Sequence, residues 1–318
     1  MAPTRDALPA DPTVAIVLCT YNGAEWLPAQ LASIAAQTHM DWVLCVSDDG
    51  SQDGTLDLIH AFARAHPVWI APDRARSSGL TSAQRAAENF LQTLSHPNLP
   101  IGPNTHIALC DQDDVWRPDK LAHALATLSA VPADQPAVYG GQSCHITEDG
   151  RRIADSKPPG KPLGLGNALV QNVVSGHSTV LSPAGVQRMR AAGVPHGIYY
   201  HDWWIYLFIT ALGGHVIVDD HVALDYRQHG ANVMGAGQGS AARLRRLGQI
   251  WSGEYSAWVQ ANLNALTNTK AELSPDAKSA LEHLSDGPSL RTLRKAGAYR
   301  QSTLDSLCIY GAAALGRI

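Results

Sequence analysis

Three aspartates crowd one short segment of the chain. The apolar run Ile107–Cys110 is predicted to be a buried strand, and Pro118 is predicted to open the next helix. Between them lie Asp111, Asp113 and Asp114. Carboxylates packed this closely repel one another unless a cation or a ring of donors compensates. Because hard carboxylate oxygens suit Mg²⁺ or Mn²⁺, we expect a metal site here, and a purely structural acidic turn is the alternative.

Two further strand ends carry polar side chains. Val14–Cys19 and Trp42–Ser47 are short apolar runs, typical of buried parallel strands. In a doubly wound sheet the carboxyl ends of such strands converge on one crevice. The polar residues that follow the two runs are Thr20, Tyr21 and Asn22, and Asp48 and Asp49.

The chain has no glycine-rich phosphate loop. Neither GxGxxG nor GxxxxGK[ST] occurs, which disfavours dinucleotide binding and P-loop nucleotide binding. The acidic strand ends favour a nucleotide held through its base, its sugar and a metal-bridged diphosphate.

The alternation of strands and helices predicts an α/β fold, with a doubly wound parallel sheet over about the first 130 residues. Beyond about Ser240 the alternation stops, and only amphipathic helices are expected. Three regions follow from this pattern: a disordered tail at 1–12, an α/β domain at 13–235, and a helical C-terminal extension at 236–318.

Composition restricts the class of protein. A net charge of −4 and a pI near 6.4 argue against a dedicated nucleic-acid binder. The five cysteines show no paired spacing, which indicates buried thiols in a reducing compartment. The chain shows neither a secretory signal nor an apolar run of membrane-spanning length, so we expect a cytoplasmic protein.

Five motifs occur in a familiar order: TYNG, SDDGSQDGT, DQDDVWRPDK, HDWW and YRQHGAN. In this order they resemble the family 2 glycosyltransferases with a GT-A fold. Among these the chain is most similar to bacterial rhamnosyltransferase-like enzymes of surface polysaccharide assembly, including lipopolysaccharide. The resemblance covers about residues 14–232, and it implies a mixed sheet flanked by helices, with the helical extension outside it.

The resemblance implies a nucleotide-sugar donor site. Asp49 would accept the imide N–H of uracil or thymine, a bond for which a carboxylate is the right acceptor. Asp114 and His229 would ligate Mg²⁺ or Mn²⁺, and Asp113 would bind the ribose or support the metal. The other donor-binding residues implied are Thr20, Tyr21, Asn22 and Arg227.

The resemblance also implies the catalytic residues. Asp202 would be the base that deprotonates the acceptor hydroxyl, although an N-cap role for Asp202 is compatible with this. His201 stands where many relatives have Glu, and it would share acid–base or acceptor-binding work. Trp203 and Trp204 would stack on an acceptor sugar, with core packing the alternative for one of them.

The function implied is an inverting, metal-assisted transfer of a sugar to a hydroxyl of a growing bacterial cell-surface glycan. The implied donor is dTDP-L-rhamnose, and the acceptor is a glycan or lipid-linked glycan. A UDP-sugar-dependent transferase and a non-catalytic sugar-nucleotide or glycan-binding scaffold are the alternatives. The C-terminal helices are expected to pack on the α/β domain, or to make a peripheral contact with the inner face of the cytoplasmic membrane.

Overall fold

The computed structural model describes residues 8–9, 11–72, 77–229 and 248–318. Most of the expected N-terminal tail and the end of the YRQHGAN motif therefore lie outside the described residues. The same is true of the start of the C-terminal extension.

The first half of the sheet is parallel, as the sequence predicts. Its strands lie in the order β3-β2-β1-β4, and each neighbouring pair is parallel. Helix α2 begins at Thr55. Asp53, two residues earlier, accepts hydrogen bonds from the Thr55 amide and from the Ala24 amide. The elements are β1 (Val14–Thr20), α1 (Leu27–Ala35), β2 (Trp42–Asp48), α2 (Thr55–Phe62), β3 (Val68–Ile70), α3 (Ser82–Ser95) and β4 (His106–Cys110).

The second half makes the sheet mixed. Strand β8 is antiparallel to β4 and β6, whereas β9 is parallel to β6 and antiparallel to β5. Strands β6 and β9 extend well beyond the apolar runs at 137–141 and 216–218, because the rest of each strand contains polar residues. The elements are β5 (Val115–Trp116), α4 (Lys120–Leu128), β6 (Ala137–Ile146), β7 (Arg152–Asp155), α5 (Leu165–Ala168), the 3-10 turn η2 (Gly176–Ser178), β8 (Val180–Leu181), α6 (Pro183–Ala192), α7 (His201–Ala211) and β9 (His215–Arg227).

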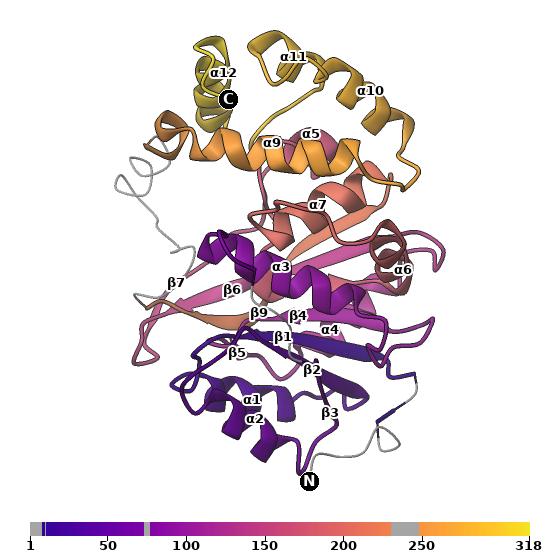
Figure 1. The fold of residues 1–318 in the computed structure, drawn as a ribbon, viewed down its shortest axis with the longest axis vertical. Helices are drawn as coiled ribbons and strands as arrows, with labels where there is room; N and C mark the ends of the chain where they lie inside the picture. The colour runs from indigo at the N-terminus through magenta and orange to yellow at the C-terminus, as the bar shows by residue number, and fades with distance from the viewer. Residues whose placement is uncertain (1–7, 10, 73–76, 230–247) are drawn as a thin grey trace.

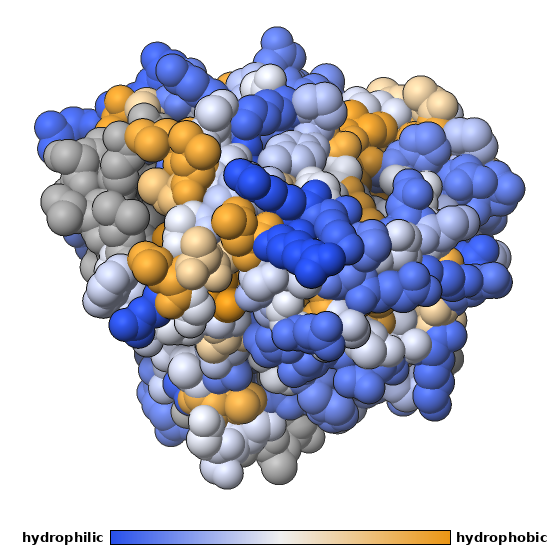
Figure 2. Space-filling model, turned by 90° about the horizontal axis from the view of Figure 1, so that it is seen from above, coloured by the Kyte–Doolittle hydropathy of each residue, from blue (hydrophilic) through white to orange (hydrophobic). Residues whose placement is uncertain are grey.

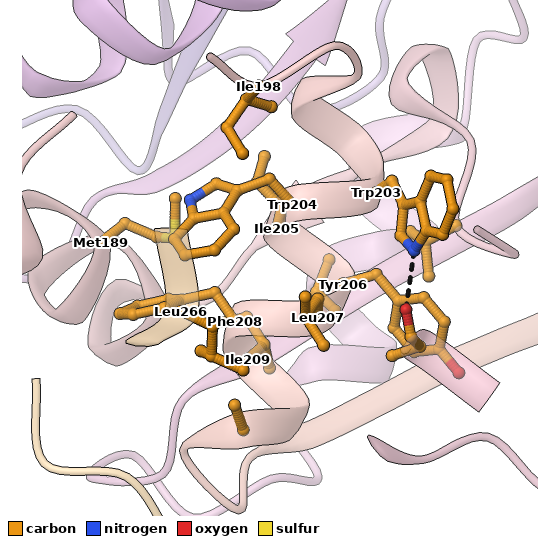
Figure 3. Close-up of a cluster of buried hydrophobic side chains, with 14 of the residues drawn as sticks. Met189, Ile198, Trp203, Trp204, Ile205, Tyr206, Leu207, Phe208, Ile209 and Leu266 are labelled. Atoms are coloured by element: carbon orange, nitrogen blue, oxygen red, sulfur yellow. Dashed lines mark hydrogen bonds between the residues drawn. The ribbon is translucent and has the colours of Figure 1, made fainter. Parts of the chain in front are cut away.

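Helices cover both faces of the sheet (Figure 1). Helices α1, α2 and α4 share one apolar core with one face, and α3, α6 and α7 share a second core with the other. Helix α7 is apolar on all sides, and its residues 203–211 are buried. Figure 3 shows the labelled side chains of α7 in this second core, together with Met189, Ile198 and Leu266.

The C-terminal helices form a further layer on α7 (Figure 1). Tyr255, Leu263 and Leu266 are buried in the same core cluster as Trp203 and Phe208, so these helices pack on the α/β part of the molecule. Within the described residues no helix is long and apolar enough to cross a membrane. The helices are α9 (Glu254–Thr267), α10 (Pro275–His283), α11 (Leu290–Lys295) and α12 (Thr303–Ala314).

Candidate active site

The carboxyl ends of β1, β2 and β4 open into one large cavity of about 1120 Å³. The sheet side contributes Thr20, Asp49 and Asp111, as the crevice argument predicts for parallel strand ends. The opposite wall comes from the start of α7 and from the C-terminal helices, and includes Asp202 and Trp258. Residues of both the α/β domain and the C-terminal helical extension therefore line the cavity.

The TYNG turn is held rigidly at the end of β1. The Gln112 side chain clamps Tyr21, accepting from its amide at 2.9 Å and donating to its carbonyl at 3.1 Å. Thr20 donates to Asp48 at 2.7 Å. Asn22 adopts a left-handed conformation with φ 47°, and its side-chain oxygen accepts from the Gln52 amide at 2.8 Å. Thr20, Tyr21 and Asn22 all line the cavity, as expected.

Asp49 faces a cation that the sequence did not single out. The Arg85 Nε lies 4.0 Å from an Asp49 carboxylate oxygen, and both residues line the cavity. The Asp49 amide donates to the Thr20 carbonyl at 2.8 Å, which fixes the backbone of Asp49 beside β1. A carboxylate held at this strand end can accept a hydrogen bond from a ligand N–H.

Asp113 and His229 meet at the cavity wall, although 116 positions separate them in the chain. His229 Nε2 lies 2.9 Å from the Asp113 carboxylate, and both residues line the cavity. The His229 ring stacks on Trp26 at a centroid distance of 5.3 Å. A carboxylate oxygen and an imidazole nitrogen this close form a donor pair that suits a divalent cation.

Arg227 lies behind this pair and does not line the cavity. Its guanidinium sits 5.0 Å from the Trp26 ring, and its Nη1 donates to the Glu148 carbonyl at 2.7 Å. Arg227, which the resemblance implies as a donor-binding residue, thus packs against Trp26, on which His229 stacks.

A second group with metal-ligand chemistry consists of Asp111, Asp114 and His177, whose ligand atoms all lie within 4.8 Å of one another. Burial raises the pKa of both carboxyls, that of Asp111 to about 7, with added repulsion from Asp113. Burial also lowers the pKa of His177 to about 3, so its imidazole is neutral and can ligate a metal. However, Asp114 is fully buried and does not line the cavity.

Lys120 provides a buried cation beneath these acids. Its Nζ donates to the His177 carbonyl at 2.5 Å and lies 3.4 Å from the Trp116 ring centroid. Burial lowers the pKa of Lys120 to about 7, and the Asp114 and Asp111 carboxylates oppose this shift. A lysine here partly offsets the crowding of carboxylates that the sequence suggested a metal would compensate.

Asp202 lies at the start of α7, where the helix N-terminus favours a negative charge. One of its oxygens accepts from the Gly176 amide at 3.0 Å, and the other accepts from the Trp203 amide at 2.8 Å. Asp202 lines the cavity and interacts electrostatically with Asp111 across it. The carboxylate is thus held in place and faces the acidic strand end.

His201 is packed more tightly than a freely mobile acid–base group. Its ring stacks on Phe90 with centroids 4.0 Å apart, and burial lowers its pKa. Its Nε2 has no hydrogen-bond partner among the described residues, and the residue lines the cavity.

The two tryptophans of HDWW separate. Trp203 donates from its indole to the Ala168 carbonyl at 2.7 Å (Figure 3), and it still contributes to the cavity wall. Trp204 is 2% exposed and packs in the core beside Met189 and Ile198 (Figure 3). It does not line the cavity, and its position matches the core packing that the sequence left open for one of the two tryptophans.

Several lining residues escaped the sequence reasoning. The cause is the same for each: no local motif marks them, and only the tertiary fold brings them to the cavity. At Trp26 the sequence shows only an apolar residue beside the first helix. The others are Arg85, His177, Tyr200, Tyr255, Trp258 and Arg300.

Comparison with known proteins identifies the family of the segment that carries these strand ends. Residues 15–153 match the family model described as glycosyl transferase family 2. This segment contains β1, β2 and β4 with all their cavity-lining ends. Residues 15–153 form a family 2 glycosyltransferase domain. The chain is 25% identical to the dTDP-rhamnosyl transferase RfbG of Shigella flexneri, over 79% of this chain and 85% of that protein.

Solved structures show the same fold for the chain. TarS of S. aureus, residues 1–349 in complex with UDP-GlcNAc, superposes with a TM-score of 0.57 at 14% identity, covering 86% of this chain and 73% of that one. The mannosyltransferase PcManGT of Pyrobaculum calidifontis, in complex with GDP-Man and Mn²⁺, gives 0.50 at 19% identity, covering 97% and 79%. The GT-A architecture expected from the motifs is thereby confirmed.

Proposed function

We propose that this protein is an inverting glycosyltransferase that moves a sugar from a nucleoside diphosphate to a hydroxyl of a bacterial cell-surface glycan. One observation carries the proposal: the Asp202 carboxylate, fixed by two backbone amides, lines the same cavity as the polar ends of β1, β2 and β4. Such a carboxylate is positioned to accept a proton beside the reacting carbon.

The reaction is a single displacement. The acceptor hydroxyl oxygen attacks the anomeric carbon while Asp202 takes the hydroxyl proton. The bond from that carbon to the diphosphate oxygen breaks, and the nucleoside diphosphate leaves with the bonding electron pair. Because attack and departure occur on opposite faces, the anomeric configuration inverts.

Donor recognition is proposed for the sheet side of the cavity. Asp49 accepts the imide N–H of the base, with Arg85 beside it, while Thr20, Tyr21 and Asn22 shape the base pocket. We propose dTDP-L-rhamnose as the donor, which the similarity to RfbG supports. A UDP-sugar is the second candidate, supported by the TarS complex with UDP-GlcNAc.

A divalent cation, Mg²⁺ or Mn²⁺, is proposed to assist. Asp113 and His229 fit it best, because this oxygen and nitrogen pair lines the cavity; the sequence instead suggested Asp114 with His229. Asp111 and His177 are the next nearest candidates, and PcManGT was solved with Mn²⁺. When bound, the cation would stabilise the negative charge of the departing diphosphate.

The first experiment is calorimetric titration of dTDP-rhamnose and a panel of UDP-sugars, with Mn²⁺ and then with a chelator. We expect one donor to bind in a metal-dependent manner. Asp113→Ala should weaken this binding by about tenfold or more, since one close ligand pair is lost, whereas Asp114→Ala should reduce metal dependence less. If Asp114→Ala weakens metal-dependent donor binding more than Asp113→Ala does, Asp114 is the metal ligand instead.

Turnover separates a transferase from a binding scaffold. Asp202→Asn should keep donor affinity within about twofold and lower the rate of nucleoside diphosphate release by a factor of about 100 or more. Equal rates in both proteins would remove Asp202 from the reaction. If the wild type binds a donor and never releases a nucleoside diphosphate, the scaffold hypothesis is correct.

A lipid-linked acceptor is proposed to bring the enzyme to the inner face of the membrane. The C-terminal helices offer a surface for this contact. Seen from their side, the molecule shows apolar groups among hydrophilic ones (Figure 2). The exposed apolar side chains of this region are Trp251, Leu304, Leu307 and Leu315.

A further inference from the structure

We infer that the helical wall of the cavity is an acceptor subsite that binds an anionic group of the acceptor glycan through Arg300. The inference rests on the proposed function, because it names the chemistry of the acceptor for the same active site. The ligand group is a phosphate or a carboxylate attached to a sugar, since a guanidinium pairs with either of them in the same forked geometry.

The helical wall is continuous with the proposed catalytic base. Tyr200, two residues before Asp202, meets the Trp258 ring edge-on at a centroid distance of 5.0 Å. Trp203, directly after Asp202, stacks on Tyr255 at 6.2 Å. Both aromatic partners belong to α9. An acceptor whose hydroxyl reaches Asp202 must therefore lie against side chains that the C-terminal helices supply.

Arg300 stands in this wall without a carboxylate partner. Its guanidinium carbon lies 5.7 Å from the Tyr255 ring centroid, and its Nη1 is 3.5 Å from the Val170 carbonyl. Its Nε has no hydrogen-bond partner, and no Asp or Glu oxygen lies within 4.0 Å of its nitrogens, in the part of the chain that the structure describes. A charge-assisted hydrogen bond to a bound anion would stabilise this half-buried guanidinium, which has no carboxylate partner in the described part of the chain.

The donor diphosphate is a poor candidate for this anion. The groups suited to the donor, Asp49, Asp113 and His229, sit at the sheet side and around Trp26. Asp202 separates the two sides, since it faces Asp111 on one and is flanked by residues packed on α9 on the other. Arg300 therefore serves whatever approaches Asp202 from the helices.

The cavity has room for both substrates and a surface for a sugar ring. Its volume of about 1120 Å³ exceeds that of pockets that hold one small ligand, roughly 300–1,000 Å³. Trp258 is partly exposed and lines the cavity, so its indole offers an apolar platform. The subsite thus combines an aromatic platform with a cation, as expected for a charged sugar.

The test uses the full chain with its donor side saturated by dTDP or UDP and Mn²⁺. Three probes are titrated while tryptophan fluorescence and calorimetric heat are followed: α-D-glucose 1-phosphate, methyl α-D-glucuronide and the neutral methyl α-D-glucoside. We expect at least one charged probe to bind about tenfold more tightly than the neutral one, which is typical of a charge-assisted hydrogen bond. Which charged probe binds separates a phosphate from a carboxylate.

Variants assign the effect to Arg300. Arg300→Gln should abolish the preference for the charged probe, and Arg300→Lys should retain part of it, which guards against a mere folding defect. Arg291→Gln removes an exposed charge from neighbouring α11 and should change nothing. Thermal melting of each variant checks that it folds.

The inference is overturned if all three probes bind equally, if Arg291→Gln has the effect of Arg300→Gln, or if excess nucleotide displaces the charged probe. Failure of the proposed function has a different signature, because the protein would then bind neither nucleotide nor any nucleotide sugar. The probe titration is informative in that case too, since it needs no turnover.

Discussion

At the scale of single residues, the crowding of carboxylates at Asp111 has a consequence for stability. Burial, with repulsion from Asp113, raises its pKa from 3.8 to about 7. The native state therefore keeps this proton to a higher pH than the unfolded state, and the contribution of Asp111 to the free energy of unfolding falls as pH rises from about 4 to about 7.

Asp111→Asn should therefore stabilise the metal-free protein at pH 8 by at least about 1 kcal/mol, since one pKa unit corresponds to about 1.4 kcal/mol. The gain should shrink toward zero as pH falls to about 4. Urea denaturation of both proteins with a chelator present, at pH 5 and pH 8, measures this. A gain that is the same at both pH values would mean that Asp111 is ionised in both.

Gly176 is a second residue with a specific prediction. A Cβ placed there would lie 2.8 Å from His201 Nε2 and 3.5 Å from the Asp202 Cβ. Gly176→Ala should push both side chains and disturb the Gly176 amide that holds Asp202. We expect kcat to fall by a factor of about 10 to 100, as for a misplacement near the chemistry, with donor affinity unchanged.

The matched control for this change is Gly160→Ala, where an added Cβ meets nothing within 4 Å. It should leave the rate of nucleoside diphosphate release as it is in the wild type. If both alanine variants are fully active, close packing around Gly176 does not position the base.

What the sequence could reveal about these residues depended on how local the signal was. The polar residues that follow β1, β2 and β4 could be predicted to lie together, because parallel strands carry the residues after them to one edge of the sheet. The Asp113 and His229 contact and the role of Arg227 behind Trp26 were not, because they depend on how β9 returns beside β5. The sequence did not say which of Trp203 and Trp204 packs in the core, because HDWW begins a helix and consecutive helical residues point in different directions.

At the scale of elements, α9 is an integral part of the core. Leu263 is 5% exposed and packs in the same cluster as α7, so Leu263→Ala should lower the free energy of unfolding by about 2–5 kcal/mol. Leu307→Ala on α12, where the side chain is 59% exposed, should change it by less than about 0.5 kcal/mol. Chemical denaturation measures both.

The shape of the unfolding curve provides a further criterion. If the C-terminal helices formed a separate unit, Leu263→Ala would shift an early transition and leave a later one in place. A single shifted transition is expected from the shared core.

The packing of these helices was harder to predict than their existence. Helical periodicity indicated amphipathic helices but not their partner, because α7 is apolar on all sides and gives no sign of which face is covered. The apolar runs 137–141 and 216–218 mark only parts of β6 and β9, because polar residues such as Gln142 and Asp225 continue the pairing beyond them.

At the scale of the whole molecule, the candidate active site lies between the sheet and the C-terminal helices α9 to α12, which we call the helical cap. The family match ends at residue 153, yet Asp202, Trp258 and Arg300 lie beyond it and line the same cavity. The matched segment supplies the strand ends that we propose for the donor, and the later part of the chain supplies the wall that we propose for the acceptor.

The outer side of this cap carries the last prediction. Trp251 is 63% exposed with the Arg317 guanidinium 4.9 Å from its ring, and Leu307 is 59% exposed. Residues 290–318 contain five basic side chains and one acidic one, which favours an anionic surface. The protein should therefore sediment with vesicles containing anionic lipid and be released by about 0.5 M salt, where the screening length falls to a few ångströms.

The double variant Trp251→Asp and Leu307→Asp should weaken vesicle binding by about tenfold or more, because both apolar contacts are lost and two negative charges are added. Met40→Asp is the matched control, since Met40 is 71% exposed on the loop between α1 and β2, and α1 packs on the face of the sheet opposite to α7. Donor binding should be unaffected in both, as none of these residues lines the cavity. If the wild type stays in the supernatant with both anionic and neutral vesicles, the C-terminal helices do not bind the membrane surface.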